Sequence, residues 1–392
     1  MDDLQGEKLK SIPPYILSVI KTEMMKLRRA GEDVIDFGMG NPDGETPRHI
    51  VDKLVEAVQN PKNHRYSASR GIYKLNLALA DWYKRRFDVD LDPNSEVITT
   101  IGAKEGISHL MYAMLNRGDT VLVPAPCYPI HNYSVALAGG NVISVPVEKD
   151  TDFFENMVKE VHNTWPKPKV LLLNYPHNPT TEVVDRAFFE KIVAFAKENN
   201  IVVLHDNAYA EIYFDDYVPP SFLEVPGAKD IGAEFYSLSK TFNMPGWRVG
   251  FLAGNAKIVK SLERIKGYLD YGMFQPIQIA AIHALNSSHA CVEDIRAEYK
   301  KRRDVLVEGL VKLGWEVDKP KATMFVWAKI PEEYKKMGSL DFSMKLLKEA
   351  KTATSAGAGF GEGGEGYIRF SLIENEYRTR QAIKNIKNMM SG

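Results

Sequence analysis

The chain reads Ser237-Leu238-Ser239-Lys240-Thr241-Phe242-Asn243-Met244-Pro245-Gly246-Trp247-Arg248 at the end of a short apolar run. This stretch brings one lysine amine together with two serine hydroxyls and a guanidinium. A lysine that forms an imine must present a neutral amine, and neighbouring cations lower its pKa. A bound phosphate needs hydroxyls and a fixed arginine. The stretch therefore predicts an imine-forming lysine beside a phosphate site, against the alternative of a surface lysine and arginine around a Pro-Gly turn.

Outward from this stretch, between about residues 95 and 255, short apolar runs alternate with helical patterns. Apolar residues recur at helical spacing over residues 106–116 and 188–199, which predicts two amphipathic helices. Strands separated by helices imply a mostly parallel sheet with both faces covered, and hence an α/β protein. The runs interpreted as strands are residues 96–101, 121–123, 142–147, 170–173, 201–204 and 234–238.

Chemically distinctive residues come directly after these runs. In sheets of this kind, ligands bind beyond the carboxyl ends of the strands, so such residues are expected to converge. Those after the first run open a predicted helix, whose free backbone N–H groups form an anion site. The residues that follow successive runs are Gly102-Ala103-Lys104, Tyr128, Asn178, Asp206 with Tyr209, and Lys240.

The length and composition predict a globular protein of two parts. A chain of 392 residues is too long to fold around one ordinary hydrophobic core, and its 44% hydrophobic content argues against disorder. A net charge of −1 does not favour nucleic acid or an anionic membrane as a partner. No apolar run approaches the roughly 18 residues of a membrane helix. Two cysteines and a polar, acidic N-terminus favour a reducing, cytoplasmic location.

Other candidate sites are weaker. No group of His, Cys and carboxylate residues has metal-ligand spacing, so no metal is predicted. His177 and His205 are interpreted as structural, and Cys127 as a packed thiol. The glycine-rich stretch 357–366 predicts a flexible loop, because no helix with Lys and Ser/Thr follows it. Gly38-Met39-Gly40 has a misplaced third glycine, which argues against a nicotinamide dehydrogenase.

The motifs in this order resemble those of a known family. From Ile35-Asp36-Phe37-Gly38-Met39-Gly40-Asn41-Pro42-Asp43 to Tyr367-Ile368-Arg369-Phe370-Ser371, the chain resembles the class I, fold-type I aminotransferases that use pyridoxal 5′-phosphate (PLP). The resemblance implies a mostly parallel central sheet covered by helices, plus a smaller α+β domain. It implies a large PLP-binding domain of residues 45–285 and a small domain of residues 1–44 and 286–392. The segment Pro13-Pro14-Tyr15-Ile16 is expected to close over the mouth as a lid.

The resemblance also assigns roles around PLP. Lys240 forms the imine with the cofactor and shuttles the proton from the substrate Cα. Asp206 pairs with the pyridinium nitrogen, which keeps the ring an electron sink. Tyr128 stacks on the ring, and Tyr209 and Asn178 bind its phenolic oxygen. The phosphate is held by Ala103, Lys104, Ser237, Ser239 and Arg248, and, in a homodimer, by Tyr66 of the partner subunit.

The substrate carboxylate has its own expected partners. Arg369 resembles the arginine that grips the α-carboxylate, a task that suits a planar guanidinium better than lysine. Asn178 and the backbone of Gly40 are expected beside it. For the distal carboxylate of glutamate the candidates are Lys104, Arg70 and Arg65, with Lys104 favoured. Residues 269–273 lack the arginine that one subgroup of aspartate aminotransferases uses for this purpose.

The finer resemblance is to the bacterial glutamate–pyruvate (alanine) aminotransferases. It implies transfer of an amino group from L-alanine to 2-oxoglutarate, giving pyruvate and L-glutamate by a ping-pong aldimine/ketimine mechanism. The same chemistry with aspartate, methionine or LL-diaminopimelate as donor remains open, as does a PLP β-lyase. The presence of both Lys240 and Asp206 argues against a binding protein without catalysis.

Overall fold

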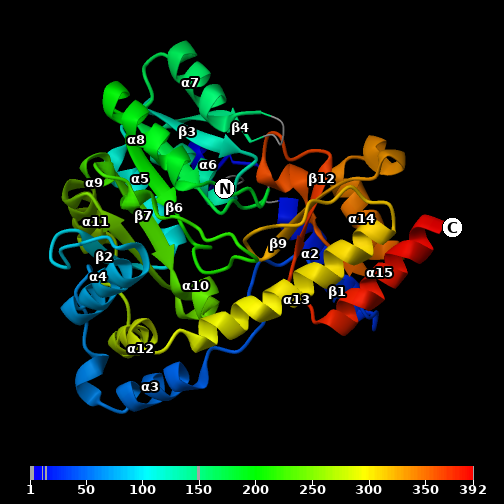
Figure 1. Cartoon of the computed structure of the whole chain (residues 1–392), viewed down its shortest axis with the longest axis horizontal. Coiled ribbons are helices and arrows are strands. Elements are labelled where there is room, and N and C mark those ends of the chain that lie inside the picture. Colours follow the sequence, from blue (N-terminus) through cyan, green and yellow to red (C-terminus); the bar gives the residue numbers. More distant parts are fainter. Residues whose placement is uncertain (1–3, 11, 14–15, 148–150, 392) are drawn as a thin grey trace.

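A computed structural model describes residues 4–10, 12–13, 16–147 and 151–391 of the chain. Its centre is a seven-stranded sheet with the strand order β2-β8-β7-β6-β5-β3-β4 (Figure 1). The strands are β2 (Val97–Ile101), β3 (Thr120–Ala125), β4 (Asn141–Pro146), β5 (Val170–Asn174), β6 (Val202–Asp206), β7 (Gly232–Ser237) and β8 (Val249–Gly254). The six predicted strands are confirmed to within a few residues at their ends.

The sheet is mostly parallel, as predicted, with one exception. β3, β4, β5, β6 and β7 pair in parallel, whereas β8 pairs antiparallel with both β7 and β2. The sequence interpretation missed β8. Because β8 runs the other way, it begins at the edge where its neighbours end, and this places Arg248, the residue before it, at that edge.

Alternation along the strands divides the apolar core between the two faces of the sheet. In β5, Val170 and Leu172 pack on one face, and Leu171 and Leu173 on the other. Helices cover both faces, which explains why the strands are apolar throughout. One face carries α5 (Ala103–Met114), α6 (Pro129–Ala138) and α11 (Ala256–Leu269). The other carries α4 (Tyr73–Phe87), α7 (Phe153–Asn163), α8 (Arg186–Asn199) and α12 (Gln275–Asn286).

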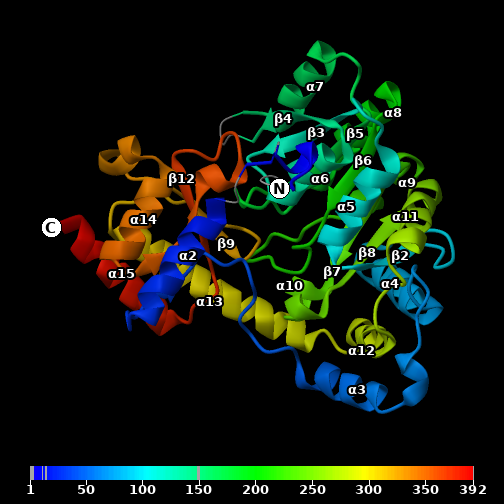
Figure 2. The same ribbon diagram turned by 180° about the vertical axis from the view of Figure 1, so that it is seen from behind.

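A second group of elements lies at one end of the central sheet and has its own apolar core (Figures 1 and 2). β1 (Ile35–Asp36) pairs in parallel with β10 (Thr352–Ala353), so the N-terminal segment joins the C-terminal part of the chain. A three-stranded antiparallel sheet has the order β11 (Ser355–Ala356), β12 (Tyr367–Ser371), β9 (Phe325–Lys329). The surrounding helices are α2 (Ile16–Arg29), α13 (Ala290–Lys312), α14 (Ser339–Glu349) and α15 (Glu376–Ser391).

The remaining elements are mostly short. They are α1 (Glu7–Lys10), α3 (Arg48–Val58), α9 (Ala228–Ile231), α10 (Leu238–Thr241), and 3-10 turns over Pro61–His64, Phe222–Glu224, Pro245–Trp247, Glu332–Met337 and Gly357–Phe360. The last turn differs from the flexible loop predicted for residues 357–366. Gly357 is buried, and a Cβ on it would lie 1.9 Å from the Gly364 carbonyl oxygen, so this part of the stretch is closely packed.

Two further expectations concern the ends of the chain and membranes. Of the predicted lid, Pro14 and Tyr15 lie outside the described residues, while α2 begins at Ile16 and lines the cavity described below with Leu17 and Met24. Among the described residues, no helix has the length and apolar character to cross a membrane.

Candidate active site

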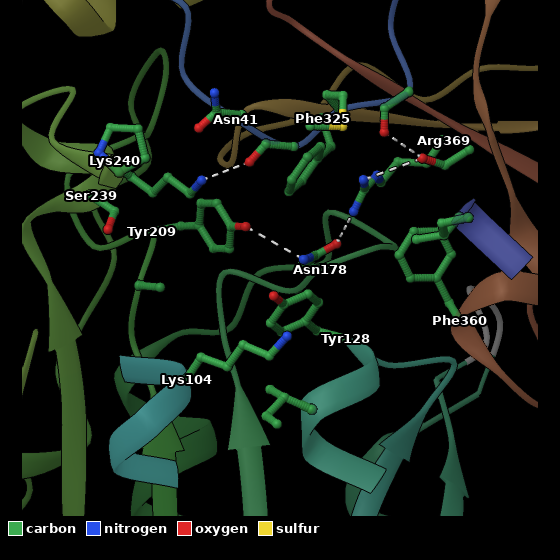
Figure 3. Close-up of a pocket in the computed structure, with 18 of the residues that line it drawn as sticks. Asn41, Lys104, Tyr128, Asn178, Tyr209, Ser239, Lys240, Phe325, Phe360 and Arg369 are labelled. Carbon is green, nitrogen blue, oxygen red and sulfur yellow. Dashed lines mark hydrogen bonds between the residues drawn. The ribbon is translucent and has the colours of Figure 1, made fainter. Parts of the chain in front are cut away.

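The carboxyl ends of the parallel strands open onto a cavity of about 640 Å³ (Figure 3). The second group of elements closes its opposite side with Phe325 of β9 and Arg369 of β12. Tyr66 and the two alternative candidates for the distal carboxylate, Arg65 and Arg70, do not line it. Arg70 instead donates to Glu263 and to the Val97 carbonyl oxygen. The predicted site residues that do line the cavity are Gly40, Ala103, Lys104, Tyr128, Asn178, Asp206, Tyr209, Ser237, Ser239, Lys240, Arg248 and Arg369. Residues from six strand ends and from the far end of the chain thus meet in one place.

Lys240 lies in α10, the single helical turn that follows β7. Its Nζ donates a hydrogen bond to the Gly40 carbonyl oxygen at 2.8 Å. Removal from water, together with the positive charges of Arg369 and Arg248, lowers the pKa of Lys240 to about 7. A substantial fraction of this amine is therefore neutral near neutral pH, as nucleophilic attack requires.

Arg248, Gly102 and the start of α5 form an anion-binding corner. Arg248 Nη1 donates to the Pro245 carbonyl oxygen at 2.9 Å, which fixes its side chain. Gly102 has φ +78°, and a Cβ there would lie 2.2 Å from Arg248 Nη2, so only glycine allows this approach. The N–H groups of Ala103 and Lys104 begin α5 at this point. A guanidinium beside a helix N-terminus suits a phosphate group.

Asp206 ends β6 and is almost completely buried. Its Oδ2 lies 2.9 Å from His131 Nε2 on α6, a partner that the sequence interpretation missed. Its Oδ1 is also buried and has no hydrogen-bond partner among the residues the structure describes. A buried acceptor of this kind is costly unless a ligand satisfies it. Asp206 therefore fits a protonated ring nitrogen of a bound group.

Arg369 is held in a fixed position on the other side of the cavity. Its Nη1 donates to Asn178 Oδ1 at 2.7 Å and its Nη2 to Ser355 Oγ at 3.3 Å. The guanidinium carbon lies 4.0 Å from the ring centre of Phe325 and 4.6 Å from that of Phe360 (Figure 3). This aromatic sandwich was also missed, because neither phenylalanine lies in a predicted strand-end motif. It orients a planar cation toward the cavity.

Two tyrosines complete the lining. Tyr209 receives a 3.4 Å hydrogen bond from Asn178 Nδ2, and burial raises the pKa of its hydroxyl above the usual value. Tyr128 stands at the N-cap of α6, with its ring edge-on to that of His131. Both rings face the cavity between Lys104 and Lys240 (Figure 3).

Tyr66 is the predicted cofactor-binding residue that lies outside this cavity. Its side chain is exposed, with 87% of the residue's surface accessible. Its ring rests against that of Tyr271, at a centroid distance of 5.0 Å. In this single chain, Tyr66 is therefore directed to the outside of the molecule.

The buried histidines are held in hydrogen-bond networks. His205 Nδ1 lies 2.8 Å from Glu234 Oε2, on β7. His177 Nδ1 lies 2.7 Å from Thr180 Oγ1, and burial lowers the pKa of His177 to about 3. Burial also raises the pKa of the Cys127 thiol to about 12, so the thiolate that a nucleophile requires is disfavoured.

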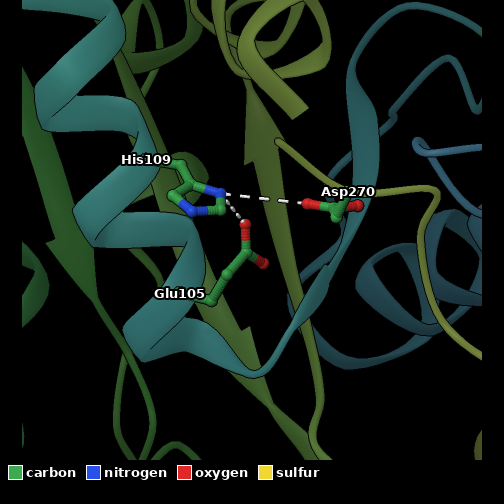
Figure 4. Close-up of side chains that lie close together, drawn as sticks. All are labelled: Glu105, His109 and Asp270. Atoms are coloured by element: carbon green, nitrogen blue, oxygen red, sulfur yellow. Dashed lines mark ion pairs between the residues drawn. The ribbon is translucent and has the colours of Figure 1, made fainter. Parts of the chain in front are cut away.

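Three residues of types that bind metal ions come together only in the folded chain. Glu105, His109 and Asp270 place one ligand atom each within 4.8 Å of one another (Figure 4). The ammonium of Lys266, a fully buried residue, lies 3.1–3.3 Å from the carboxylate oxygens of both acids. A cation that belongs to the protein thus offsets one of the two negative charges of this cluster. The sequence indicated no such group because Asp270 is distant from the other two.

A lysine amine with a lowered pKa and a buried carboxylate with one unpartnered oxygen, set at the edge of this sheet, are features expected of a PLP-dependent enzyme of fold type I. Over residues 32–386 the chain matches the family described as aminotransferase class I and II, and it belongs to that family.

The chain is similar in sequence to known aminotransferases along almost its whole length. It is 53% identical to glutamate–pyruvate aminotransferase AlaC of Escherichia coli, over 97% of this chain and 93% of the relative. It is 43% identical to LL-diaminopimelate aminotransferase of Halothermothrix orenii, over 98% of both. Among solved structures, substrate-bound BacF from Bacillus subtilis superposes with a TM-score of 0.92 at 37% identity, covering 98% of each chain. The chain is a PLP-dependent aminotransferase and acts on amino acids and 2-oxo acids.

The residues present fit PLP. The unpaired Asp206 Oδ1 suits the ring nitrogen, and Lys240 offers an amine with a lowered pKa. Gly102 leaves room for the Arg248 guanidinium next to the start of α5. One cavity thus contains separate groups that would suit the ring nitrogen, the aldehyde and the phosphate of the cofactor.

Proposed function

We propose that this enzyme transfers the amino group of L-alanine to 2-oxoglutarate, giving pyruvate and L-glutamate. The observation that carries the proposal is the 53% identity with a glutamate–pyruvate aminotransferase over 97% of the chain. The site is consistent with it. Both substrates carry an α-carboxylate, for which the buried guanidinium of Arg369 is the matching partner.

The cofactor contacts that we propose are those implied by the family resemblance, and they are supported by the fact that their residues line one cavity, apart from Tyr66. Pyridoxal phosphate, when bound, supplies an aldehyde for the substrate amine and an electron-withdrawing ring. Lys240 carries the cofactor and then moves the proton at the substrate Cα. Asp206 holds the proton on the ring nitrogen, and His131 fixes the orientation of Asp206. Tyr209 and Asn178 would bind the phenolic oxygen, and Tyr128 would cover the ring. The phosphate would be held by Ala103, Lys104, Ser237, Ser239 and Arg248.

The substrate lies between Lys240 and Arg369. Arg369 forms paired hydrogen bonds with the α-carboxylate, while Asn178 and the Gly40 backbone line the same position. A Cβ at Gly40 would lie 3.5 Å from Arg369 Nη2, which shows how closely this backbone approaches the guanidinium. Lys104, which reaches into the cavity beside Tyr128, is the partner we assign to the distal carboxylate of glutamate (Figure 3).

A second donor has specific support. Several LL-diaminopimelate aminotransferases are 41–44% identical to this chain over 97–98% of its length. We therefore keep LL-diaminopimelate as the alternative amino donor. In that case the cavity has to accept a longer side chain that ends in a second ammonium and carboxylate.

We also propose that the enzyme is a homodimer in which Tyr66 of the partner subunit contacts the cofactor phosphate. The support is a row of exposed aromatic contacts on one surface. Tyr66 packs on Tyr271, which is 66% exposed, and His64 packs on Phe274, which is 42% exposed. Exposed apolar rings of this kind are typical of an interface. Sedimentation of the purified enzyme as a monomer would contradict the proposal.

For the domains we propose residues 45–285 as the large unit, and residues 1–44 with 286–392 as the small one. All seven strands of the central sheet fall within the first range. The strands of the other two sheets fall within the second. Limited proteolysis is expected to cut first near residues 287–289, between α12 and α13.

The decisive experiment is an absorption spectrum of the purified enzyme. The bound cofactor should give a visible band that L-alanine bleaches and 2-oxoglutarate restores. LL-Diaminopimelate is the comparison donor. A band that responds to LL-diaminopimelate but not to alanine would replace the first proposal with the second, and a band that responds to neither would reject both.

A further inference from the structure

Arg302 on α13 makes several charged contacts, although it has no part in the site described above. Its Nη1 and Nη2 donate to the two carboxylate oxygens of Asp43 at 2.6 and 3.1 Å. Its Nε donates to Glu298 at 3.1 Å, and Nη1 also donates to the Leu372 carbonyl oxygen at 3.0 Å. The side chain is only 10% exposed. A partly buried, bidentate arginine pair is geometrically specific, and lysine cannot reproduce it.

Both segments that Arg302 contacts also carry a residue of the active site. Asp43 comes three residues after Gly40, whose carbonyl accepts the Lys240 hydrogen bond. Leu372 comes three residues after Arg369 and directly follows β12. One guanidinium therefore joins the loop that carries Gly40 to the strand that carries Arg369. The distance between these two segments sets the space available to the α-carboxylate of the substrate.

Among the hydrogen bonds of the described residues, the other anchors of the Gly40 loop lie on either side of Asp43, and they include the bond from Lys240 to the Gly40 carbonyl oxygen. Before Asp43, Gly38 O accepts from Ser355 Oγ at 2.8 Å, and Phe37 O accepts from the Ser371 N–H at 2.8 Å. After it, Thr46 Oγ1 donates to Asn243 O at 2.6 Å. The first anchors belong to the small sheets and the last to the turn that follows Lys240. Arg302 acts between them, where the loop passes from one part of the protein to the other.

We propose that Arg302 and Asp43 are positioning residues that hold the Gly40 loop and β12 at the separation needed to bind the substrate α-carboxylate. The inference rests on the proposed role of Arg369. Neither residue lines the cavity, so the pair acts through Gly40 and Arg369 and does not touch the substrate. Alanine and 2-oxoglutarate both carry an α-carboxylate. Loosening the Arg302–Asp43 pair should therefore weaken the binding of both substrates by similar factors.

The neighbouring residue provides a matched control. Arg303, also on α13 and fully buried, donates to Asp215 at 2.8 Å and to the Pro320 carbonyl oxygen at 2.8 Å. This pair resembles the first, because each arginine binds an aspartate outside its helix, an acid of its own helix (Glu298 or Asp304) and one backbone carbonyl. It has no contact with the Gly40 loop or with β12 among the bonds described. Asp215→Asn and Arg303→Lys therefore test the loss of a similar ion pair elsewhere.

The experiment compares holoenzymes of the wild type, Asp43→Asn, Arg302→Lys, Asp215→Asn and Arg303→Lys. The probe is 2-methylalanine, which carries an amine and an α-carboxylate but no Cα hydrogen, so it binds without turnover. Its dissociation constant is read from the change in cofactor absorbance. We expect Asp43→Asn and Arg302→Lys to raise this constant, and the KM values of alanine and 2-oxoglutarate, about tenfold, with kcat within about threefold of wild type.

Thermal melting of all five proteins separates positioning from general damage. If Asp43→Asn and Arg302→Lys bind the probe like the Asp215 and Arg303 variants, the Arg302–Asp43 pair has no positioning role. The same conclusion holds if all four variants lose affinity in proportion to their loss of melting temperature. Arg369→Lys tests the underlying assignment separately. Unchanged probe binding in that variant would reject the role of Arg369 itself, and with it the positioning role of the Arg302–Asp43 pair.

Discussion

The guanidinium of Arg248 occupies the space in which a side chain at position 102 would stand. A Cβ on Gly102 would lie 2.2 Å from Nη2 and 2.7 Å from the guanidinium carbon. The glycine also has φ +78°, a conformation that other residues rarely adopt. Two segments almost 150 residues apart thus meet at the corner that we assign to the cofactor phosphate.

From this contact we predict that Gly102→Ala weakens cofactor binding. The methyl group would displace Arg248 and strain the turn into α5. The dissociation constant for PLP should rise by at least about tenfold, since one charge-assisted contact to the phosphate is lost. Titration of the apoprotein with PLP, followed by absorbance, measures it. Gly118→Ala is the control, because Gly118 also has positive φ but nothing lies within 4 Å of its added Cβ. Equal losses in both variants would contradict the prediction.

The pKa of Lys240 predicts how stability depends on pH. Its folded-state pKa of about 7 lies below the value of about 10.4 for a free lysine, so the unfolded chain binds more protons between these two values. The stability of the apoprotein should therefore rise with pH from about 7 toward 10, relative to a variant without this amine. Urea denaturation of wild-type and Lys240→Met apoproteins at several pH values tests this difference. Parallel pH profiles would show that the lysine is not desolvated. The same variant should lack turnover.

Asp206→Asn should lower kcat without loss of the fold. The amide keeps the size of the carboxylate and one acceptor, but it cannot stabilise a protonated ring nitrogen. We expect kcat to fall on the order of a hundredfold or more, the usual scale for loss of one electrostatic contact to developing charge. Steady-state kinetics with alanine measures this, and the absorption spectrum shows whether the cofactor is retained. A near-normal kcat would remove Asp206 from the site.

Glu234 is expected to be a major determinant of stability below the active site. This fully buried carboxylate accepts hydrogen bonds from Tyr83, Asn207, Ser221, His205 and the Phe222 N–H. Glu234→Leu would leave these donors without a partner and should reduce the free energy of unfolding by about 3 kcal/mol or more. Urea denaturation measures the loss. Glu190→Leu, which breaks an exposed pair with Arg186 on α8, should change stability by less than about 1 kcal/mol.

Much of the fold could be predicted because its signals are local. Apolar runs marked six of the seven strands of the central sheet, and helical spacing marked α5 and α8. β8 was missed because its sequence, Val-Gly-Phe-Leu-Ala-Gly, contains two glycines, which weaken the signal of a strand. The glycine-rich stretch was interpreted as flexible because composition does not report packing, whereas Gly357 is confined against Gly364.

The sequence by itself determined the order of the elements, the family and the residues that follow each strand. The order of the elements depends on spacings of two to four residues along the chain, which hydrophobic periodicity records directly. The family follows from the resemblance of the motifs between residues 35 and 371. Only the tertiary structure decided which of those residues meet. His131 beside Asp206, Phe325 and Phe360 around Arg369, and Arg302 on Asp43 are each contacts between distant segments. Such contacts depend on how the sheet, its reversed strand β8 and the second group of elements pack together, and no local pattern specifies that packing.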